Sequence, residues 1–193
     1  MIQETIITSI GTDGYVHVSP MGVHLEGDHY LIMPFRPSTT LEHVLATKHA
    51  VMNHTDDVRV YAGCLTGRRH WPLTETTVVP GKRLADCLSH QELELARVEN
   101  DAQRPRLYCK MVHQQTHLPF KGFNRAQFAV LEAAILVSRL SRLPWQKIHT
   151  DLDYLEIAIN KCAGEREREA WEWLMQAVDQ YKQDHPDKTN LQP

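Results

Sequence analysis

The sequence predicts an α+β protein in which an antiparallel split β-barrel is followed by a C-terminal three-helix bundle. Up to about residue 115, short β-branched or alternating apolar runs are separated by Gly, Pro and Asp turn signals, as in antiparallel strands. From Asn124 onward the apolar residues recur at helical spacing instead. The expected divisions are residues 1–120 for the barrel, 121–185 for the helices and 186–193 for a disordered tail.

The composition is that of an ordinary globular protein. Of its 193 residues, 42% are hydrophobic and 23% are charged, which is enough apolar material for one large domain or two small ones. The net charge of −3 argues against a general nucleic-acid binder, which needs a basic face. No apolar run approaches the roughly 20 residues of a membrane helix. We therefore expect a cytoplasmic protein without nucleic-acid or membrane partners.

Cysteine and histidine spacing predicts no metal site. The four cysteines lie far apart without a Cys-x-x-Cys pair, so they are interpreted as reduced thiols. The twelve histidines are scattered, and none forms a His-x-x-x-His pair with a nearby acidic residue. A metal hydrolase built from His17, His24 and His54 is a remote alternative, because no carboxylate partner would fix these rings.

The first strands should form a hairpin with a kinked return strand. Residues 4–10 are rich in β-branched residues, Asp13-Gly14 signals a tight turn, and residues 15–19 alternate. Pro20 and Gly22 then interrupt the pattern, since proline cannot donate to a ladder and glycine marks a bulge or a close approach. This stretch is either a plain bulge or a place where a flat ligand lies against main chain.

A segment from Pro34 to Thr40 joins the third strand, residues 29–33, to a helix that should end near Lys48. It contains Arg36 and three consecutive hydroxyl residues, Ser38, Thr39 and Thr40. The first turn of a helix has unpaired N–H groups and a positive dipole end, and a guanidinium suits phosphate. The segment therefore predicts a phosphate site, and the simpler alternative is an N-cap beside a solvated arginine.

The remaining barrel elements follow from short apolar runs. Residues 50–54 read as a fourth strand, and residues 58–62 resume it or open a fifth. Further strands are expected over residues 74–79, 92–100 and 106–115, with a short helical turn over residues 83–87. The total of six or seven strands is a usual number for a closed antiparallel sheet.

Three helices should complete the chain. Asn124 is a good N-cap for a buried helix that Pro144 stops. A second helix is expected over residues 145–162 with Gly164 as its C-cap, and a third over residues 165–182.

A second basic segment contains Arg68, Arg69 and Trp71. The arginines can reach an anionic ligand, and the tryptophan can stack on a ring or a guanidinium. The alternative is an exposed loop with a buried tryptophan, and the sequence leaves both readings open.

The order of three meandering strands, a crossing helix and a further strand resembles the FMN-binding split β-barrel of flavin reductases and pyridoxamine-phosphate oxidases. A closer resemblance covers nearly the whole chain and rests on six segments, which are residues 2–6, 17–23, 34–40, 53–59, 63–69 and 122–127. On these segments the chain resembles an uncharacterised family of split-barrel flavoproteins from archaea and from bacteria with methanopterin-linked metabolism.

The resemblance implies bound FMN, a homodimer, and a barrel followed by helices. It places the flavin ring edge against the backbone of Met21, Gly22 and Val23. It places the phosphate on Arg36, Ser38, Thr39 and Thr40, and gives Asn53 and Asp56 contacts to the ribityl chain or the ring.

The function expected from the resemblance is that of an FMN-dependent oxidoreductase, similar to flavin reductases and linked to pterin-dependent one-carbon metabolism. No catalytic side chain is assigned, because hydride passes directly between flavin and substrate and the flavin carries the electron chemistry. One alternative is a non-enzymatic flavin carrier, store or sensor. Another is a helical interaction module whose barrel holds no ligand.

Overall fold

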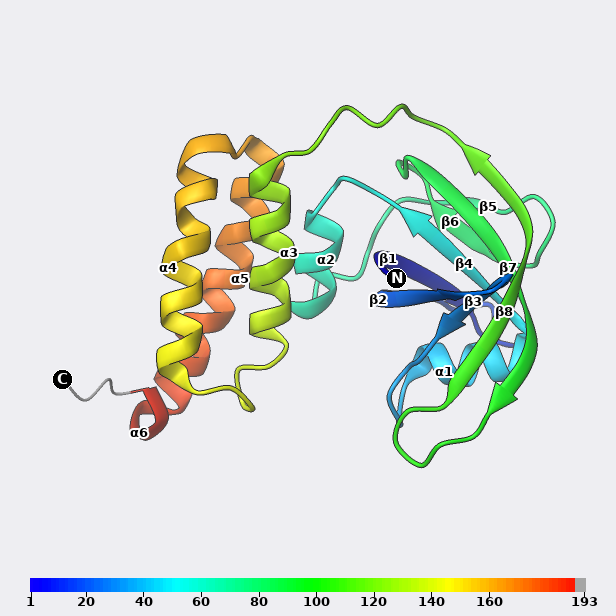
Figure 1. Ribbon diagram of the computed structural model, residues 1–193, viewed down its shortest axis with the longest axis horizontal. Helices are drawn as coiled ribbons and strands as arrows, with labels where there is room; N and C mark the ends of the chain where they lie inside the picture. Colours follow the sequence, from blue (N-terminus) through cyan, green and yellow to red (C-terminus); the bar gives the residue numbers. More distant parts are fainter. Residues whose placement is uncertain (190–193) are drawn as a thin grey trace. The chain divides into compact units, whose positions relative to one another are not determined.

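The structure is a computed structural model that describes residues 1–189. Six strands close into an antiparallel barrel in the order β1-β2-β3-β8-β7-β4, and β5 pairs with β6 in a separate hairpin (Figure 1). The strands are β1 (Ile2–Ile10), β2 (Val16–Glu26), β3 (His29–Ile32), β4 (His49–His54), β5 (Leu73–Glu75), β6 (Lys82–Leu84), β7 (Ser89–Glu99) and β8 (Arg106–Thr116). The helices are α1 (Thr39–Thr47), α2 (Arg59–Leu65), α3 (Arg125–Val137), α4 (Trp145–Cys162), α5 (Glu165–Asp184) and α6 (Pro186–Thr189).

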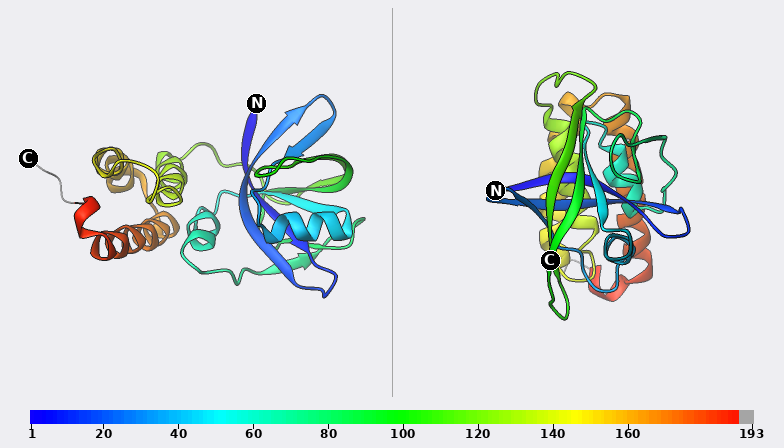
Figure 2. Two further views of the ribbon diagram at one scale, coloured as in Figure 1. Left: turned by 90° about the horizontal axis from the view of Figure 1, so that it is seen from below. Right: turned by 90° about the vertical axis from the view of Figure 1, so that its right-hand side faces the viewer.

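The structure confirms the antiparallel barrel and the predicted first hairpin. Gly14 takes a positive φ of 84° in the turn between β1 and β2, as the Asp-Gly signal predicts. The interior is filled by side chains that alternate along the strands, together with two residues of α1, Leu41 and Val44. Helix α1 therefore packs into the barrel, and two viewing directions show it beside the strands (Figures 1 and 2).

The β5-β6 hairpin covers the outer face of β1, β4 and β7. Thr8 Oγ1 donates to the carbonyl of Lys82 (2.5 Å), and the amide of Leu84 donates to Asn53 Oδ1 (2.8 Å). Because β4 residues alternate, Met52 points into the barrel while Asn53 points out toward the hairpin. Polar side chains on the outside of the barrel are thus buried by a second layer of chain.

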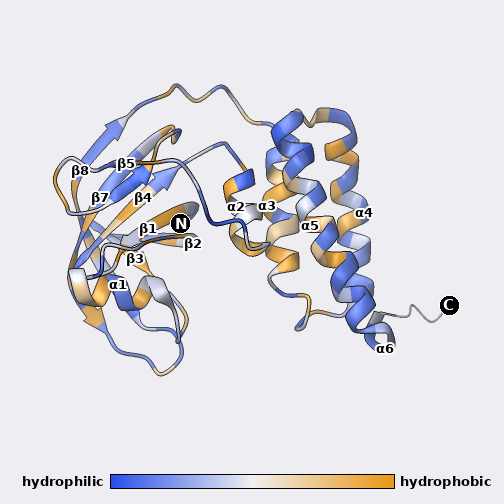
Figure 3. Ribbon diagram, turned by 180° about the vertical axis from the view of Figure 1, so that it is seen from behind, coloured by the Kyte–Doolittle hydropathy of each residue, from blue (hydrophilic) through white to orange (hydrophobic). Residues whose placement is uncertain are grey.

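The helical unit is larger than the predicted C-terminal three-helix bundle. The three expected helices are present as α3, α4 and α5, and Asn124 caps α3 by accepting from the amide of Ala126 (2.8 Å). However, the compact unit also includes residues 57–69, which lie between barrel elements in the sequence. Val58 and Ala62 are buried in the same apolar core as α3, α4 and α5. Both α2 and α3 consist mostly of hydrophobic residues, whereas α5 is largely hydrophilic (Figure 3).

Three local predictions were wrong, and the strand predicted over residues 74–79 is shorter, since β5 ends at Glu75. Residues 58–62 were expected as a strand but form α2, because the alternating run also places Val58 and Ala62 one helical turn apart on an apolar face. Residues 83–87 were expected as a helical turn, yet Lys82–Leu84 is β6 and pairs with β5. Gly164 is the N-cap of α5, while Ala163 is the C-cap of α4.

An ion-pair network fixes the start of α2 to α5. Arg59 bonds the carboxylate of Asp57 through Nη2 (2.6 Å) and that of Glu169 through Nη1 (3.0 Å). The hydrogen bond to Asp57 raises the pKa of Arg59, against a lowering by burial. The Asp57 side chain is only 12% exposed and pairs with Arg59 there, while Nη1 of Arg166 lies 3.7 Å from the same carboxylate.

Replacing Arg59 with alanine is therefore expected to lower the free energy of unfolding by about 1–3 kcal/mol, the usual range for a half-buried charged hydrogen bond. Urea unfolding followed by tryptophan fluorescence measures the change. Arg168→Ala, an exposed arginine of α5, is the matched control. Equal stability of the two variants would contradict the proposed role of the network.

The end of the chain differs from the expected tail over its first four residues. Pro186–Thr189 forms the short helix α6, and the rest of the predicted disordered tail lies outside the described residues. Within residues 1–189, no helix combines the length and the apolar character that a membrane crossing requires.

Candidate functional site

The loop and first helical turn over residues 33–40, here named the strand–helix corner, contain all four predicted phosphate ligands. Ser38 is the N-cap of α1, and its Oγ accepts from the amide of Leu41 (3.3 Å). Ser38 is thus an N-cap, as the simpler alternative expects, but capping occupies only one acceptor site of its hydroxyl. The other first-turn amides and the positive end of the helix dipole remain suited to an anion.

Arg36 lies at the open side of this corner. It is exposed, its amide donates to the carbonyl of Gln103 (2.8 Å), and its Nε donates to the carbonyl of Asp101 (3.3 Å). Arg104 also bonds the corner, since its Nε donates to the carbonyl of Met33 (3.1 Å). The turn between β7 and β8 therefore holds the loop in place and leaves the Arg36 guanidinium accessible.

The corner lies directly beside the kinked strand. Ser19 Oγ and Thr40 Oγ1 are 2.9 Å apart, which joins β2 to the first turn of α1 across 21 residues of sequence. Thr40 is buried at this junction. Two segments predicted separately to contact one ligand are thus connected by a hydrogen bond.

Strand β2 has an open edge where the ring contact was predicted. It pairs with β1 from Val16 to His24, but within residues 1–189 it pairs with β3 only from His24 to Glu26. The edge of residues 19–23 that faces away from β1 has no strand beside it. Backbone donors and acceptors along a strand edge are suited to bind the polar rim of a flat ligand.

The side chains of the β2 segment serve the fold. Val23 is buried in the barrel core, and Met21 packs against that core. Gly22 faces β1, where an added Cβ would lie 3.1 Å from Cγ2 of Ile2. A side chain at position 22 would therefore require a small shift of the exposed Ile2 side chain. Because the side chains of Met21 and Val23 pack on the core, we expect a ligand here to contact the main chain.

Asn53 and Asp56 are not brought to the corner by any bond of the described chain. Asn53 is fully buried, and its Nδ2 donates to the carbonyl of Ile6 (3.0 Å) and to Thr8 Oγ1 (3.2 Å). Its Oδ1 accepts from the amide of Leu84. This amide group connects β1, β4 and β6, while Asp56 is half-buried just after β4.

In the second basic segment, the contacts of Arg68 show what this arginine does. The Arg68 guanidinium lies 4.5 Å from the centre of the Trp173 ring and donates to Thr66 Oγ1 (2.9 Å). Stacking on a tryptophan was predicted for this segment, but the ring is on α5 and is not Trp71. These contacts favour a structural role for Arg68.

A hollow between α4 and α5 offers no room for a flavin. Its volume is about 220 Å³, and its lining includes Trp145, Trp171 and Asp179. Pockets for drug-sized ligands start near 300 Å³.

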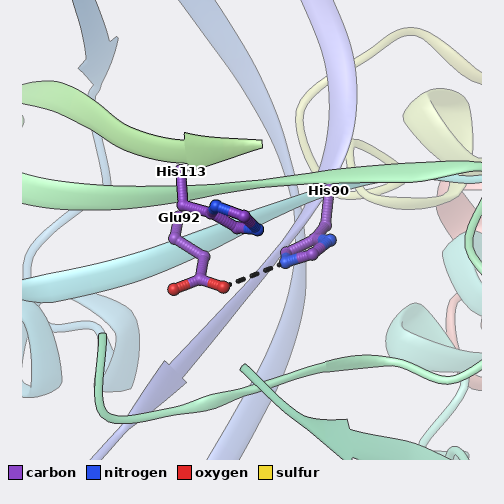
Figure 4. A group of neighbouring side chains, drawn as sticks. All are labelled: His90, Glu92 and His113. Carbon is purple, nitrogen blue, oxygen red and sulfur yellow. Dashed lines mark hydrogen bonds and ion pairs between the residues drawn. The ribbon is translucent and has the colours of Figure 1, made fainter. Parts of the chain in front are cut away.

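A second polar group, the histidine–glutamate cluster, lies on the outer face of β7 and β8 and consists of His90, Glu92 and His113. His90 and Glu92 are two residues apart on β7, so they share a face, and His113 stands opposite Glu92 on β8 (Figure 4). Their potential ligand atoms all lie within 4.8 Å of one another. His90 and Glu92 are 1% and 0% exposed.

Main-chain donors dominate the surroundings of Glu92. Its carboxylate accepts from the amides of Thr77 (2.6 Å), Val78 (2.7 Å) and Val79 (2.7 Å), and His90 Nε2 lies 3.1 Å from Oε1. Burial alone would raise its pKa, but these hydrogen bonds lower it to about 2. Burial lowers the pKa of His90. Glu92 is therefore a buried anion beside a histidine that burial favours in its neutral form.

Spacing rules missed this cluster for a physical reason. They search for ligands one helical turn apart or in Cys-x-x-Cys pairs, whereas here two ligands alternate on one strand and the third comes from its neighbour. The His-x-Glu pair at residues 90–92 was the available signal.

Two family models match the chain in succession. The N-terminal domain model of a protein of unknown function, DUF447, matches residues 3–118, and the DUF447 C-terminal model matches residues 124–176. A comparison with curated proteins found no match.

Solved structures share the fold at low identity. The FMN-bound protein MM1853 from Methanosarcina mazei, itself a DUF447 protein, superposes with a TM-score of 0.78 at 19% identity, over 91% of this chain and 94% of that one. Nitrilotriacetate monooxygenase component B from Mycobacterium thermoresistibile gives 0.53 at 15% identity, over 62% and 72% of the two chains. The 2-nitrobenzoate 2-nitroreductase NbaA from Pseudomonas fluorescens gives 0.51 at 17%, over 59% and 64%.

Proposed function

This chain belongs to the DUF447 family, and on that premise we propose that it is an FMN-binding flavoprotein and an oxidoreductase of the flavin-reductase type. The FMN-bound M. mazei protein supports the cofactor, because its fold extends over nearly the whole of both chains. The monooxygenase component and the nitroreductase support redox chemistry for this kind of barrel.

The observation that carries the proposal is the junction between Ser19 and Thr40. It sets the edge of β2 beside the start of α1, and the loop that leads into α1 contains the exposed Arg36. FMN is a flat polar ring connected to a phosphate, so it needs these two kinds of surface next to each other. The residues present fit the cofactor.

Each group has a definite task in this proposal. Arg36 and the hydroxyls of Ser38 and Thr39 would bind the phosphate at the N-terminus of α1. Thr40, also predicted as a phosphate ligand, is buried with its hydroxyl against Ser19 and would instead hold β2 to this turn. The main chain of Met21, Gly22 and Val23 binds the ring edge. Asn53 would not contact the flavin and would support the site by holding β4 to β1 and β6. Asp56 would contact the ribityl chain.

The bound flavin would supply the hydride chemistry, and the chain would supply placement and charge. A flavin carrier, store or sensor would need the same site, so geometry alone does not separate it from an enzyme. The homodimer and the link to pterin-dependent metabolism stay predictions from the family resemblance, and the cytoplasmic location stays a prediction from the sequence.

Loading the purified protein with FMN is expected to give one flavin per chain, with visible absorption that stays with the protein through gel filtration. Adding NADH or NADPH without oxygen should then bleach the flavin absorption if the protein is a reductase. A loaded protein that neither nucleotide reduces would favour the carrier. A protein that retains no FMN would refute the proposal as a whole.

A further inference from the structure

The histidine–glutamate cluster contains a buried nitrogen with no partner. Nε2 of His113 is inaccessible to solvent, and within residues 1–189 it makes no hydrogen bond. The His113 ring lies 5.8 Å from that of His90, and Figure 4 shows the His90 ring reaching the Glu92 carboxylate while the His113 ring extends toward His90. Leaving a buried polar nitrogen unsatisfied costs about 1–3 kcal/mol, a cost that a ligand bound to this nitrogen would offset.

We propose that His90, Glu92 and His113 bind one divalent transition-metal ion, and that zinc is the ion they fit best. Two imidazoles and one carboxylate form a three-ligand set that leaves a fourth position for water. Magnesium and calcium prefer oxygen ligands and do not suit imidazole.

The distances are those of a site that closes with small side-chain movements. Zinc lies about 2.0–2.1 Å from nitrogen and oxygen ligands, so two ligands of a tetrahedral ion are about 3.3 Å apart. His90 Nε2 and Glu92 Oε1 are already 3.1 Å apart. The remaining separations are no more than 4.8 Å, and rotation of the His113 ring would shorten them.

The charge of the site also favours a cation. Glu92 is a fully buried carboxylate that four donors surround, and three of these are neutral main-chain amides. These hydrogen bonds stabilise the ionised carboxylate, and a cation held between Glu92 and the two histidines would in addition neutralise its charge. Arg83 is close enough to lower the pKa of His90 by repulsion, but its guanidinium bonds the carbonyls of Leu84 and Ala85.

A second histidine orients the first. His90 Nδ1 lies 2.9 Å from Nε2 of His117, and the two rings stack with centroids 5.1 Å apart. Metal-binding histidines characteristically donate their other ring N–H to a fixed acceptor, which sets the tautomer. With zinc on Nε2, His90 would carry its proton on Nδ1 and donate it to His117.

The competing explanation is a purely structural cluster in which Glu92 holds the residue 77–79 loop and His90 only bonds Glu92. In that case His113 contributes no bond, and its replacement changes no metal affinity. The two explanations therefore differ most at His113.

The test uses full-length protein stripped with EDTA and dialysed. Titration calorimetry with zinc chloride should give one site per chain, elemental analysis should count one zinc, and magnesium should not bind. Cobalt should give the intense visible bands of a four-coordinate ion. His113→Ala should weaken zinc binding at least about 100-fold, and His117→Ala about 10-fold as an outer-shell change.

His70→Ala, which removes an exposed histidine, is the matched control and should bind zinc like the wild type. Thermal unfolding without metal checks that His113→Ala is folded, and His113→Gln replaces it if alanine destabilises the barrel. Absence of stoichiometric zinc in the wild type, or wild-type affinity in the His113 variant, overturns the proposal. An equal loss in the His70 variant also overturns it, because the metal would then lie on the surface.

Discussion

Replacing Arg36 and Ser38 together with alanine is expected to weaken FMN binding by about 100-fold or more, equivalent to about 2.7 kcal/mol. The change removes an accessible guanidinium and a hydroxyl at the N-terminus of α1. A charged hydrogen bond to phosphate contributes roughly twice as much as a neutral one, so most of the loss should come from Arg36. Quenching of flavin fluorescence during titration measures both dissociation constants.

The chain offers a matched control for this pair. Ser141 and Arg142 are adjacent exposed residues after α3, and replacing both with alanine removes the same two side-chain types from the helical unit. The control should bind FMN like the wild type. If the Arg36 and Ser38 variant also keeps wild-type affinity, the phosphate lies elsewhere and the assignment of the strand–helix corner is wrong.

Replacing Asn53 with alanine is expected to lower the free energy of unfolding by about 2–4 kcal/mol, because several buried partners lose their bonds at once. Its amide bonds the carbonyl of Ile6, the hydroxyl of Thr8 and the amide of Leu84. For a chain of this length the melting temperature should fall by roughly 5–15 °C. Calorimetry measures the fall, and hydrogen exchange at Leu84 should report the loosened β6.

Asn160→Ala is the comparison for this variant. Asn160 is exposed on α4, where alanine has the better helix propensity, so the melting temperature should hold or rise slightly. An Asn53 variant as stable as this one would show that the amide is not structural and would return it to the candidate ligand contacts.

Local signals in the sequence predict most of the fold. The Asp-Gly turn, the alternating strands and the N-cap at Asn124 each depend on neighbouring residues, and all three are confirmed. The secondary structure of residues 58–62 could not be predicted from neighbouring residues alone. An alternating apolar run fits a strand and a short helix equally well, and burial against distant α3 and α5 decides between them.

The candidate site shows the same division. The hydroxyls before α1 could be located because capping residues have a fixed place relative to a helix start. Their junction with Ser19 depends on how β2 passes α1, which no spacing rule gives. Asn53 was assigned to a ligand through the family resemblance, whereas its hydrogen-bond partners in the structure come from β1 and β6.

The excursion of residues 57–69 into the helical unit affects how this protein can be divided. The chain passes from one unit to the other after residues 56, 69 and 120, so no single cut separates the two units cleanly. A gene fragment that stops at residue 120 would still encode α2 but none of the helices that bury Val58 and Ala62. Such a fragment would expose the apolar side chains of α2 to solvent and would tend to aggregate. Work on the isolated barrel therefore requires a short loop in place of residues 57–69.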